Sequence, residues 1–270
     1  MTDGEGSEKS RQGIQSIEVG VRLLQVLVAE GRAMMLRDLA LAAGMPAAKA
    51  HRYLVSFIRA GLVCQEPASG RYDLGAFALS LGLSSIARLD PVRLATPVME
   101  DLAEALGETV ALAVWGNLGP TIVRWVESPR PVSVNLRVGA VMPLLHSATG
   151  LAFAAFGNSA TIAEGVEDAL ASAQRSGDGP PPRTRAELDV MVAEARRRGL
   201  ARAVGSVLPG INAFSAPVFD YQGQMVLALT TLGPAGAMPA DWDGDIPRRL
   251  CAAALHLSQQ LGRQAERVDP

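Results

Sequence analysis

The chain has 270 residues, 49% of them hydrophobic and 19% charged, with a formal net charge of −2 at pH 7. This length favours two domains, and the composition excludes a disordered chain. The sequence contains no run of about 18 uncharged apolar residues, so no membrane span is indicated. The acidic balance is untypical of a nucleic-acid binder, but residues 9–72 carry nine basic and four acidic residues, a local charge of +5 (9 − 4). Such a basic segment beside an acidic remainder is expected when only one end of a protein meets phosphate groups.

The first part of the chain predicts three helices followed by a β-hairpin. Apolar residues recur there at helical spacing, between residues suited to begin or end a helix. The helices are expected over residues 17–28, 35–44 and 46–60, and the strands over residues 62–65 and 71–74. The flanking residues are Ser16 as an N-cap, Pro46 at a first helical position, and Gly31 and Gly61 as helix ends. This order predicts a winged helix–turn–helix domain over residues 13–75, preceded by a flexible tail over residues 1–12.

The third helix combines an apolar face with a small, basic outer face. The apolar residues are Ala50, Tyr53, Leu54, Phe57 and Ile58. The major groove of DNA admits one helix, whose first residues reach the base edges, while a wing would contact the backbone or the minor groove. The candidate DNA-binding residues are therefore Ala47, Ala48, Lys49, His51 and Arg52 on the helix, and Ser69 and Arg71 in the wing. An ordinary amphipathic surface helix is the alternative.

Three motifs in this region carry a resemblance to a known family. They are Ala50-His-Arg-Tyr-Leu, Ala60-Gly-Leu-Val and Arg71-Tyr-Asp-Leu-Gly. The chain is similar here to the DNA-binding domain of the IclR family of bacterial transcriptional regulators, and the similarity continues over nearly all of it after residue 14. The resemblance implies double-stranded DNA with an inverted-repeat operator as a partner, and self-association as a homodimer or a dimer of dimers. Arg52 matches the arginine that usually lies in the family's third helix.

The segment over residues 77–89 is apolar, free of proline and suited to a helix. In the resembled family it is a linker helix, here over residues 76–90, that also helps to form the dimer; packing within its own chain is the alternative. Asp90 as an N-cap and Pro91 as a first residue then predict a helix to about residue 106. Within it, Pro97 either bends the helix or lets Thr96 cap a second one.

From residue 108 onward, strands and helices predict an α+β domain with one sheet. The strands are expected over residues 109–115, 121–126, 132–138, 213–219 and 225–232, and the helices over residues 148–156, 185–198 and 246–261. Residues 171–183 predict an exposed loop, and Thr184 with Glu187 predicts a capping box. The resemblance implies that residues 91–265 form a GAF-like effector-binding domain.

The same resemblance places an effector site between residues 138–150 and 210–220. The candidate effector-binding residues are Met142, Leu144, Ala148, Thr149, Asn212, Ala213, Thr230 and Leu232. Many members have cysteine, glutamate and lysine where this chain has Ala213, Ser206 and Leu151, so a less polar pocket is expected. The expected effector is an aromatic or otherwise partly apolar organic acid; the alternative is that several of these residues only form core.

The second domain shows no pattern typical of catalysis or of metal binding. His146 and Ser147 lack a nearby acidic partner, and Cys251 and His256 are five residues apart, a poor spacing for one metal ion. We therefore expect no metal and no cofactor. The polar amino terminus excludes a secretory signal peptide and the two cysteines fit a reducing compartment, so the protein should be cytoplasmic.

The sequence thus predicts a transcriptional repressor or dual regulator of a catabolic operon, controlled by a small organic acid. Two other functions are compatible with this sequence. One is a small-molecule enzyme or sensor that uses its winged helix for protein contacts, and the other is a protein-interaction adaptor.

Overall fold

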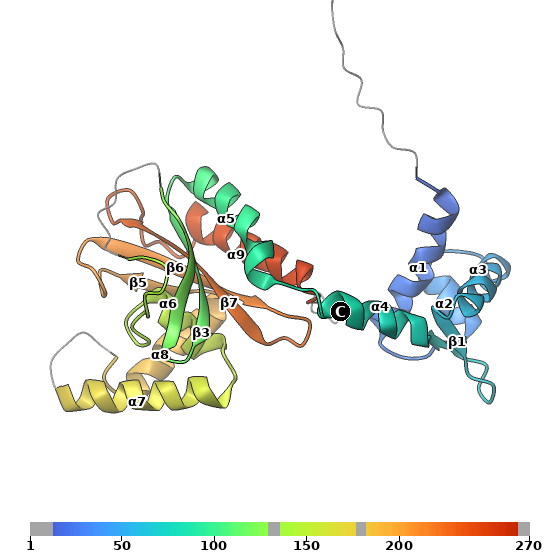
Figure 1. Ribbon diagram of the computed structural model, residues 1–270, viewed down its shortest axis with the longest axis horizontal. Coiled ribbons are helices and arrows are strands. Elements are labelled where there is room, and N and C mark those ends of the chain that lie inside the picture. Colours follow the sequence, from blue (N-terminus) through green and yellow to red (C-terminus); the bar gives the residue numbers. More distant parts are fainter. Residues whose placement is uncertain (1–12, 129–135, 177–181, 264–270) are drawn as a thin grey trace, which may run out of the picture. The chain divides into compact units, whose positions relative to one another are not determined.

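The computed structural model describes residues 13–128, 136–176 and 182–263. The chain divides into two compact units, Met1–Leu89 and Asp90–Pro270 (Figure 1). In the part of the chain that is described, no helix combines the length and the apolar character needed to cross a lipid bilayer. Each unit has its own core and is considered separately.

The first unit is a winged helix–turn–helix, as the sequence predicts. Its elements are α1 (Gln15–Glu30), α2 (Leu36–Ala42), α3 (Ala47–Arg59), β1 (Val63–Gln65), β2 (Tyr72–Leu74) and α4 (Ala76–Ile86). The hairpin β1–β2, hereafter the wing, is antiparallel, and Met34 extends it by pairing with Tyr72. Leu23, Leu27, Leu39 and Leu54 are fully or almost fully buried between the three helices.

In this unit, the helix ends predicted at glycines are confirmed, whereas the predicted helix starts are wrong. Gly31 (φ 62°) and Gly61 (φ 72°) adopt the left-handed conformation that ends a helix. The N-cap prediction for Ser16 is wrong, because α1 begins earlier, with Ile14 at the cap and no side-chain hydrogen bond. Pro46 is the N-cap of α3, not its first helical residue, and its ψ of 142° is extended. Ile58, predicted for the buried face, is 38% exposed.

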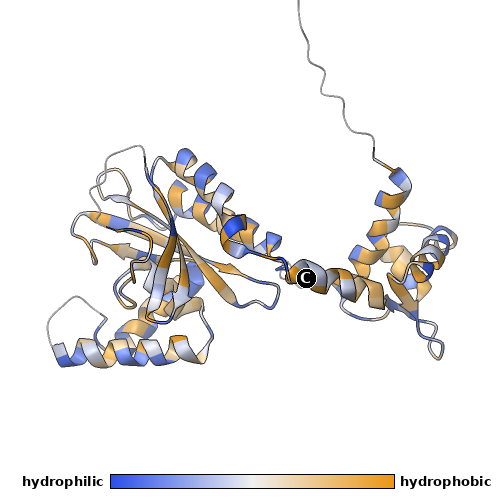
Figure 2. Cartoon of the chain, in the orientation of Figure 1, coloured by the Kyte–Doolittle hydropathy of each residue, from blue (hydrophilic) through white to orange (hydrophobic). Residues whose placement is uncertain are grey.

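Helix α4 is apolar along its length, as Figure 2 shows, yet none of its residues is buried in the chain. The exposed fractions of Phe77, Leu79, Leu81 and Leu83 lie between 49% and 64%. An 11-residue helix without a buried face is marginal by itself, because most helical stability in proteins comes from packing. These four side chains are therefore not covered by the described residues of the unit to which α4 belongs.

The second unit is built on a five-stranded antiparallel sheet with the order β4-β3-β7-β6-β5. The strands are β3 (Thr109–Gly116), β4 (Gly119–Val126), β5 (Ala201–Val204), β6 (Ile211–Phe219) and β7 (Met225–Pro234). The helices are α5 (Pro91–Leu106), α6 (Ala148–Phe156), α7 (Ala160–Ser176), α8 (Arg185–Arg198) and α9 (Asp245–Gln260). In Figure 1, α5 and α9 lie side by side on one face of the sheet, and α6 and α8 lie on the other. This is the predicted α+β architecture.

Predicted helix caps in the second unit are present. The Asp90 carboxylate accepts a hydrogen bond from the Arg93 amide at 3.0 Å, and Thr184 with Glu187 forms the capping box of α8. Helix α5 continues through Pro97 without a second start. The Thr96 hydroxyl instead donates to the Val92 carbonyl at 3.0 Å, so of the two alternatives for Pro97 the cap at Thr96 is not formed.

One prediction for an extended segment falls mostly outside the described residues, and one for an irregular segment is wrong. The expected strand over residues 132–138 lies outside the described residues at 132–135, and residues 136–138 are not in a strand. Residues 139–142 contact β4 instead, with the Gly139 amide 2.8 Å from the Ile122 carbonyl. The loop expected over residues 171–183 is helical as far as Ser176, because α7 buries Ile162, Val166 and Leu170 at helical spacing.

Candidate functional site

The five candidate residues at the start of α3 bring a small, polar and basic surface into solvent. Ala47, Ala48, Lys49, His51 and Arg52 are all exposed. Ala50 and Leu54, on the opposite side, are fully buried and hold the helix on the core. Lys49 and Arg52 form no ion pair with any residue that the structure describes, so their charges are available to an external anion.

The two wing candidates are exposed but already contact protein groups. Ser69 donates a hydrogen bond to the Glu66 carboxylate and accepts one from the Arg71 amide at 3.3 Å. The Arg71 guanidinium lies 3.5 Å from the Ala33 carbonyl, in the connection after α1. Gly70 supplies the left-handed conformation of the tip (φ 70°). Arg71 must therefore leave a weak contact before it can reach a phosphate.

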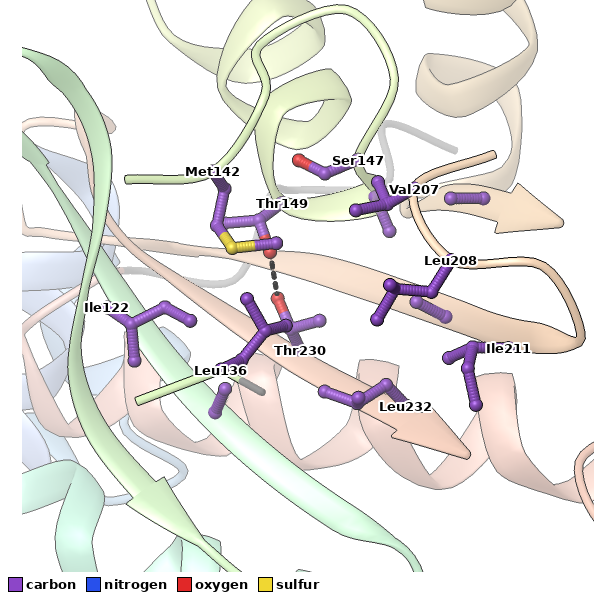
Figure 3. Close-up of a pocket in the computed structure, with 14 residues that line it drawn as sticks. Ile122, Leu136, Met142, Ser147, Thr149, Val207, Leu208, Ile211, Thr230 and Leu232 are labelled. Atoms are coloured by element: carbon purple, nitrogen blue, oxygen red, sulfur yellow. Dashed lines mark hydrogen bonds between the residues drawn. The ribbon is translucent and has the colours of Figure 1, made fainter. Parts of the chain in front are cut away.

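The second unit contains an internal cavity between α6 and the sheet, shown in Figure 3. Six of the eight predicted effector residues line it: Met142, Ala148, Thr149, Ala213, Thr230 and Leu232. The other lining residues were not named as effector candidates from the sequence; they are Ala111, Ile122, Leu136, Ser147, Ala203, Val207, Leu208 and Ile211. None of these 14 side chains is charged. The cavity is thus apolar apart from a few hydroxyl groups.

A row of hydroxyl groups supplies the polar character of this cavity. The Thr149 and Thr230 hydroxyl oxygens are 2.9 Å apart, as Figure 3 shows, and Thr230 donates to Ser215 at 2.9 Å. Ser147 caps α6: its hydroxyl accepts from the Gly150 amide at 2.8 Å and donates to the Pro143 carbonyl at 2.7 Å. These bonds satisfy polar groups that would be costly to bury alone.

Two predicted effector residues lie elsewhere. Asn212 stands between Ile211 and Ala213 on β6, and successive strand residues face opposite sides of a sheet. Its side-chain amide therefore points away from the cavity and donates to the Met238 carbonyl at 2.8 Å. Leu144 lines a separate open groove together with Trp115. The structure does not bring these two residues to the cavity.

The volume of the cavity, about 40 Å³, limits what it holds in this conformation. Sites for organic ligands usually measure about 300–1,000 Å³, whereas this volume suits only a few water molecules. Val207 and Leu208 form part of the wall. Their neighbour Ser206 donates a hydrogen bond to the His146 carbonyl at 2.7 Å, which ties the β5–β6 connection to the segment before α6. An organic ligand therefore requires the cavity to be larger than it is in this conformation.

Three titratable groups with shifted pKa values lie outside both candidate sites. Burial, and then the nearby Arg198 cation, lowers the pKa of Arg202, which stacks on Trp242 at 4.1 Å. Burial raises the pKa of the Cys251 thiol. Hydrogen bonds from the Arg183 and Thr184 amides lower the pKa of Glu187 in the capping box. None of these groups lines the cavity or the start of α3.

Comparison with known proteins links both regions to the same family. Residues 16–67 match the family model described as "IclR helix-turn-helix domain", and residues 83–259 match "Bacterial transcriptional regulator IclR C-terminal". The glycerol operon regulatory protein of Streptomyces griseus is 32% identical, over 93% of this chain and 99% of that protein. The HTH-type transcriptional repressor AllR of Klebsiella pneumoniae is 26% identical, over 96% of this chain and 94% of that protein. The crystal structure of Pseudomonas aeruginosa HmgR is 38% identical, with a TM-score of 0.84, and the match covers 93% of this chain and 100% of that one.

Proposed function

Because this chain belongs to the IclR family of bacterial transcriptional regulators, we propose that it recognises an inverted-repeat operator with the start of α3 and with the wing. The protein is a DNA-binding transcriptional regulator and not an enzyme. One observation supports the operator proposal most directly: Lys49 and Arg52 of α3 are exposed and form no ion pair with any described residue. Side chains at this position of a recognition helix reach base edges in the major groove.

A homodimer, or a dimer of dimers, is the proposed assembly. Two copies of α3 related by a twofold axis would meet successive major grooves, about 34 Å apart on one face of the duplex. The support for self-association is α4, whose four large exposed side chains are not covered by the described residues of its own unit. We propose that residues 76–90 link a DNA-binding domain (13–75) to an effector domain (91–265), and that a second copy packs against this linker.

The regulator is proposed to be a repressor or dual regulator of a catabolic operon. The name of the AllR relative supports repression, and the name of the Streptomyces griseus relative refers to an operon for a carbon compound, glycerol. The cavity favours a different effector. Its uncharged lining offers few partners for the three hydroxyl groups of glycerol, and unpaired polar groups are costly to bury. We propose instead an organic acid with an apolar, aromatic body, which suits the apolar lining, and with its acid group at the first turn of α6, near Thr149, where a helix N-terminus favours negative charge.

Effector binding is proposed to act through the wall of this cavity. Since about 40 Å³ is too small for an aromatic acid, the ligand binds only the conformations in which the wall has opened. A ligand shifts a conformational equilibrium by its difference in affinity for the two states. If the open state disfavours the operator-binding arrangement, the effector releases DNA, and operator DNA weakens effector binding by the same factor.

Footprinting of the purified protein on the promoter of its own gene, across a series of salt concentrations, tests the operator proposal. The expected result is a protected, near-palindromic site whose affinity falls by orders of magnitude as salt rises. Benzoate, phenylacetate and glycerol are then added in turn. Release or tightening by an aromatic acid, but not by glycerol, is expected. Uniform weak protection here, with no site recovered by genome-wide selection, would contradict the operator proposal; a response to glycerol alone would contradict the effector class.

A further inference from the structure

A polar hollow lies between the beginning of α1 and the exposed side of α3. It has a volume of about 350 Å³ and is lined by Ser16, Lys49, Arg52, Tyr53 and Ser56. Every one of these side chains carries a hydrogen-bond donor, two of them are cations, and none is acidic. Only Lys49 and Arg52 were predicted from the sequence to meet DNA, so the three hydroxyl groups have no role in the proposed function.

The close approach of the two helices creates this hollow. A Cβ atom on Gly20 would lie 2.9 Å from Cδ1 of Tyr53 and 3.1 Å from Cζ of Phe57, so only glycine allows α1 to pack this tightly on α3. Ser16 lies one turn before Gly20 on the same face of α1. Tyr53 is therefore held against α1 through its ring, beside the position of Ser16.

The donors of the hollow are available to a ligand. Within the ranges that the structure covers, the hydroxyl groups of Ser16 and Tyr53 have no hydrogen-bond partner. The Ser56 hydroxyl already donates to the Arg52 carbonyl, at 3.3 Å. Glu18, the acid in the first turn of α1, does not line the hollow and folds back toward Gly13, where a Cβ would meet its carboxylate. A ligand that only accepts hydrogen bonds and carries negative charge fits this set of groups.

We propose that the hollow seats one phosphate of the DNA backbone beside the major groove entered by α3. Lys49 supplies the opposite charge, and the Ser16 and Tyr53 hydroxyl groups donate hydrogen bonds to the phosphate oxygens. This inference rests on the proposed operator binding and refines it. It divides the two cations of α3 by role: Lys49 serves the backbone, which positions the protein, and Arg52 remains for the base edges, which specify the sequence.

Hydroxyl-deletion variants test this assignment without removing any charge. Ser16→Ala and Tyr53→Phe keep the helix and the ring that packs on Gly20, and Ser172→Ala and Tyr221→Phe in the second unit are the matched controls. Affinities are measured by fluorescence anisotropy, at several salt concentrations, for an operator duplex and for a scrambled duplex of the same length. Each hollow variant should bind both duplexes about tenfold more weakly, by the same factor, while the controls match wild type.

Charge variants complete the test. Lys49→Ala should lower the slope of log affinity against log salt by about one and leave the preference for the operator unchanged. Arg52→Ala should reduce that preference. Replacing chloride by inorganic phosphate at constant ionic strength should weaken DNA binding more in wild type than in Tyr53→Phe, because free phosphate competes with the DNA phosphate for the same donors.

Each contrary result has a distinct meaning. Wild-type affinity in folded Ser16→Ala and Tyr53→Phe, with folding checked by circular dichroism, would overturn the phosphate seat. A loss confined to the operator duplex would also overturn it, since the hollow would then read sequence. Binding of inorganic phosphate in the hollow together with wild-type DNA affinity in the two hydroxyl-deletion variants would identify a free-anion site instead. Failure of the wild-type protein to bind any DNA would refute the proposed function itself.

Discussion

The start of α3 and the cavity of the second unit are opposite kinds of site. The first is exposed, charged and presented by one helix, whereas the second is largely apolar, uncharged and lined by α6, five strands and two connections. A helical surface follows from local spacing, and a cavity of this kind follows from the register of distant strands. Substitutions at the start of α3 should therefore change the affinity for DNA. Substitutions in the cavity should change packing and hydrogen bonding within the second unit.

The largest expected effect tests whether the two regions are independent. Phe153 is fully buried in the core of the second unit, where its ring lies 5.6 Å from that of Trp115, so Phe153→Ala should lower the unfolding free energy of that unit by about 3–5 kcal/mol. Leu54→Ala should lower that of the first unit by about 2–5 kcal/mol. Differential scanning calorimetry should show one transition moving in each variant. If both transitions move together, the two regions are coupled and the comparison fails.

Removing one cation from α3 should weaken DNA binding and leave folding unchanged. Arg52→Ala is expected to weaken operator binding by about 1–3 kcal/mol, the usual value of a bidentate arginine–guanine contact. Arg185→Ala removes the same charge from the second unit, where Arg185 pairs with Glu167 and Asp189 at the surface. Operator affinity should be unchanged in this control. Equal losses in both variants would indicate a general charge effect and not a recognition helix.

A smaller effect is expected from the hydroxyl row in the cavity. Thr149→Val keeps the shape of the side chain but removes one hydrogen bond to Thr230, which retains its bond to Ser215. The unfolding free energy of the second unit should fall by about 0.5–1.5 kcal/mol in urea denaturation. Thr230→Val breaks both bonds and should cost more. A Thr149→Val protein as stable as wild type would show that the row contributes nothing to stability.

The smallest expected effect contrasts the two cysteines. Cys64 in the first unit is exposed, whereas Cys251 is partly buried and its thiol pKa is raised by that burial. In the native protein, Cys251 should therefore react with a thiol reagent more slowly than Cys64 near neutral pH. Because the pKa is higher in the folded state, the stability contributed by the neutral thiol is present below the unfolded-state pKa and is lost as pH rises through the folded-state pKa. Single-cysteine variants distinguish the two rates, and a faster Cys251 would be the contrary result.

Local chemistry made much of the fold predictable from the sequence. The caps at Asp90 and Thr184 depend on residues three positions apart, and the stops at Gly31 and Gly61 depend on one residue each. Helix α7 was missed although Ile162, Val166 and Leu170 have helical spacing, because the Ser- and Gly-rich composition that follows suggested a loop. Strand β5 has only four residues and depends on pairing with β6, which is a long-range contact.

The two candidate sites also differ in how well the sequence predicts their residues. All five predicted residues of α3 are exposed at its start, since one helical period determines which residues share a face. In the cavity, Thr230 and Leu232 share a face because they are two apart on β7, but the sequence could not show which face of β6 carries Asn212. Val207 and Leu208 come from a connection without periodicity, so no pattern indicated them.

The direction of the hydrogen bonds among the cavity hydroxyl groups can be reversed. Thr230 has one proton and donates it to Ser215, which leaves Thr149 to donate to Thr230 and to present lone pairs to an incoming group. If each hydroxyl turns, Ser215 donates to Thr230, Thr230 donates to Thr149, and Thr149 offers a proton. The three hydroxyl groups can thus either accept a hydrogen bond from a phenol-like donor or donate one to a carboxylate-like acceptor at the same point. Selectivity between such ligands then falls to the shape of the apolar wall.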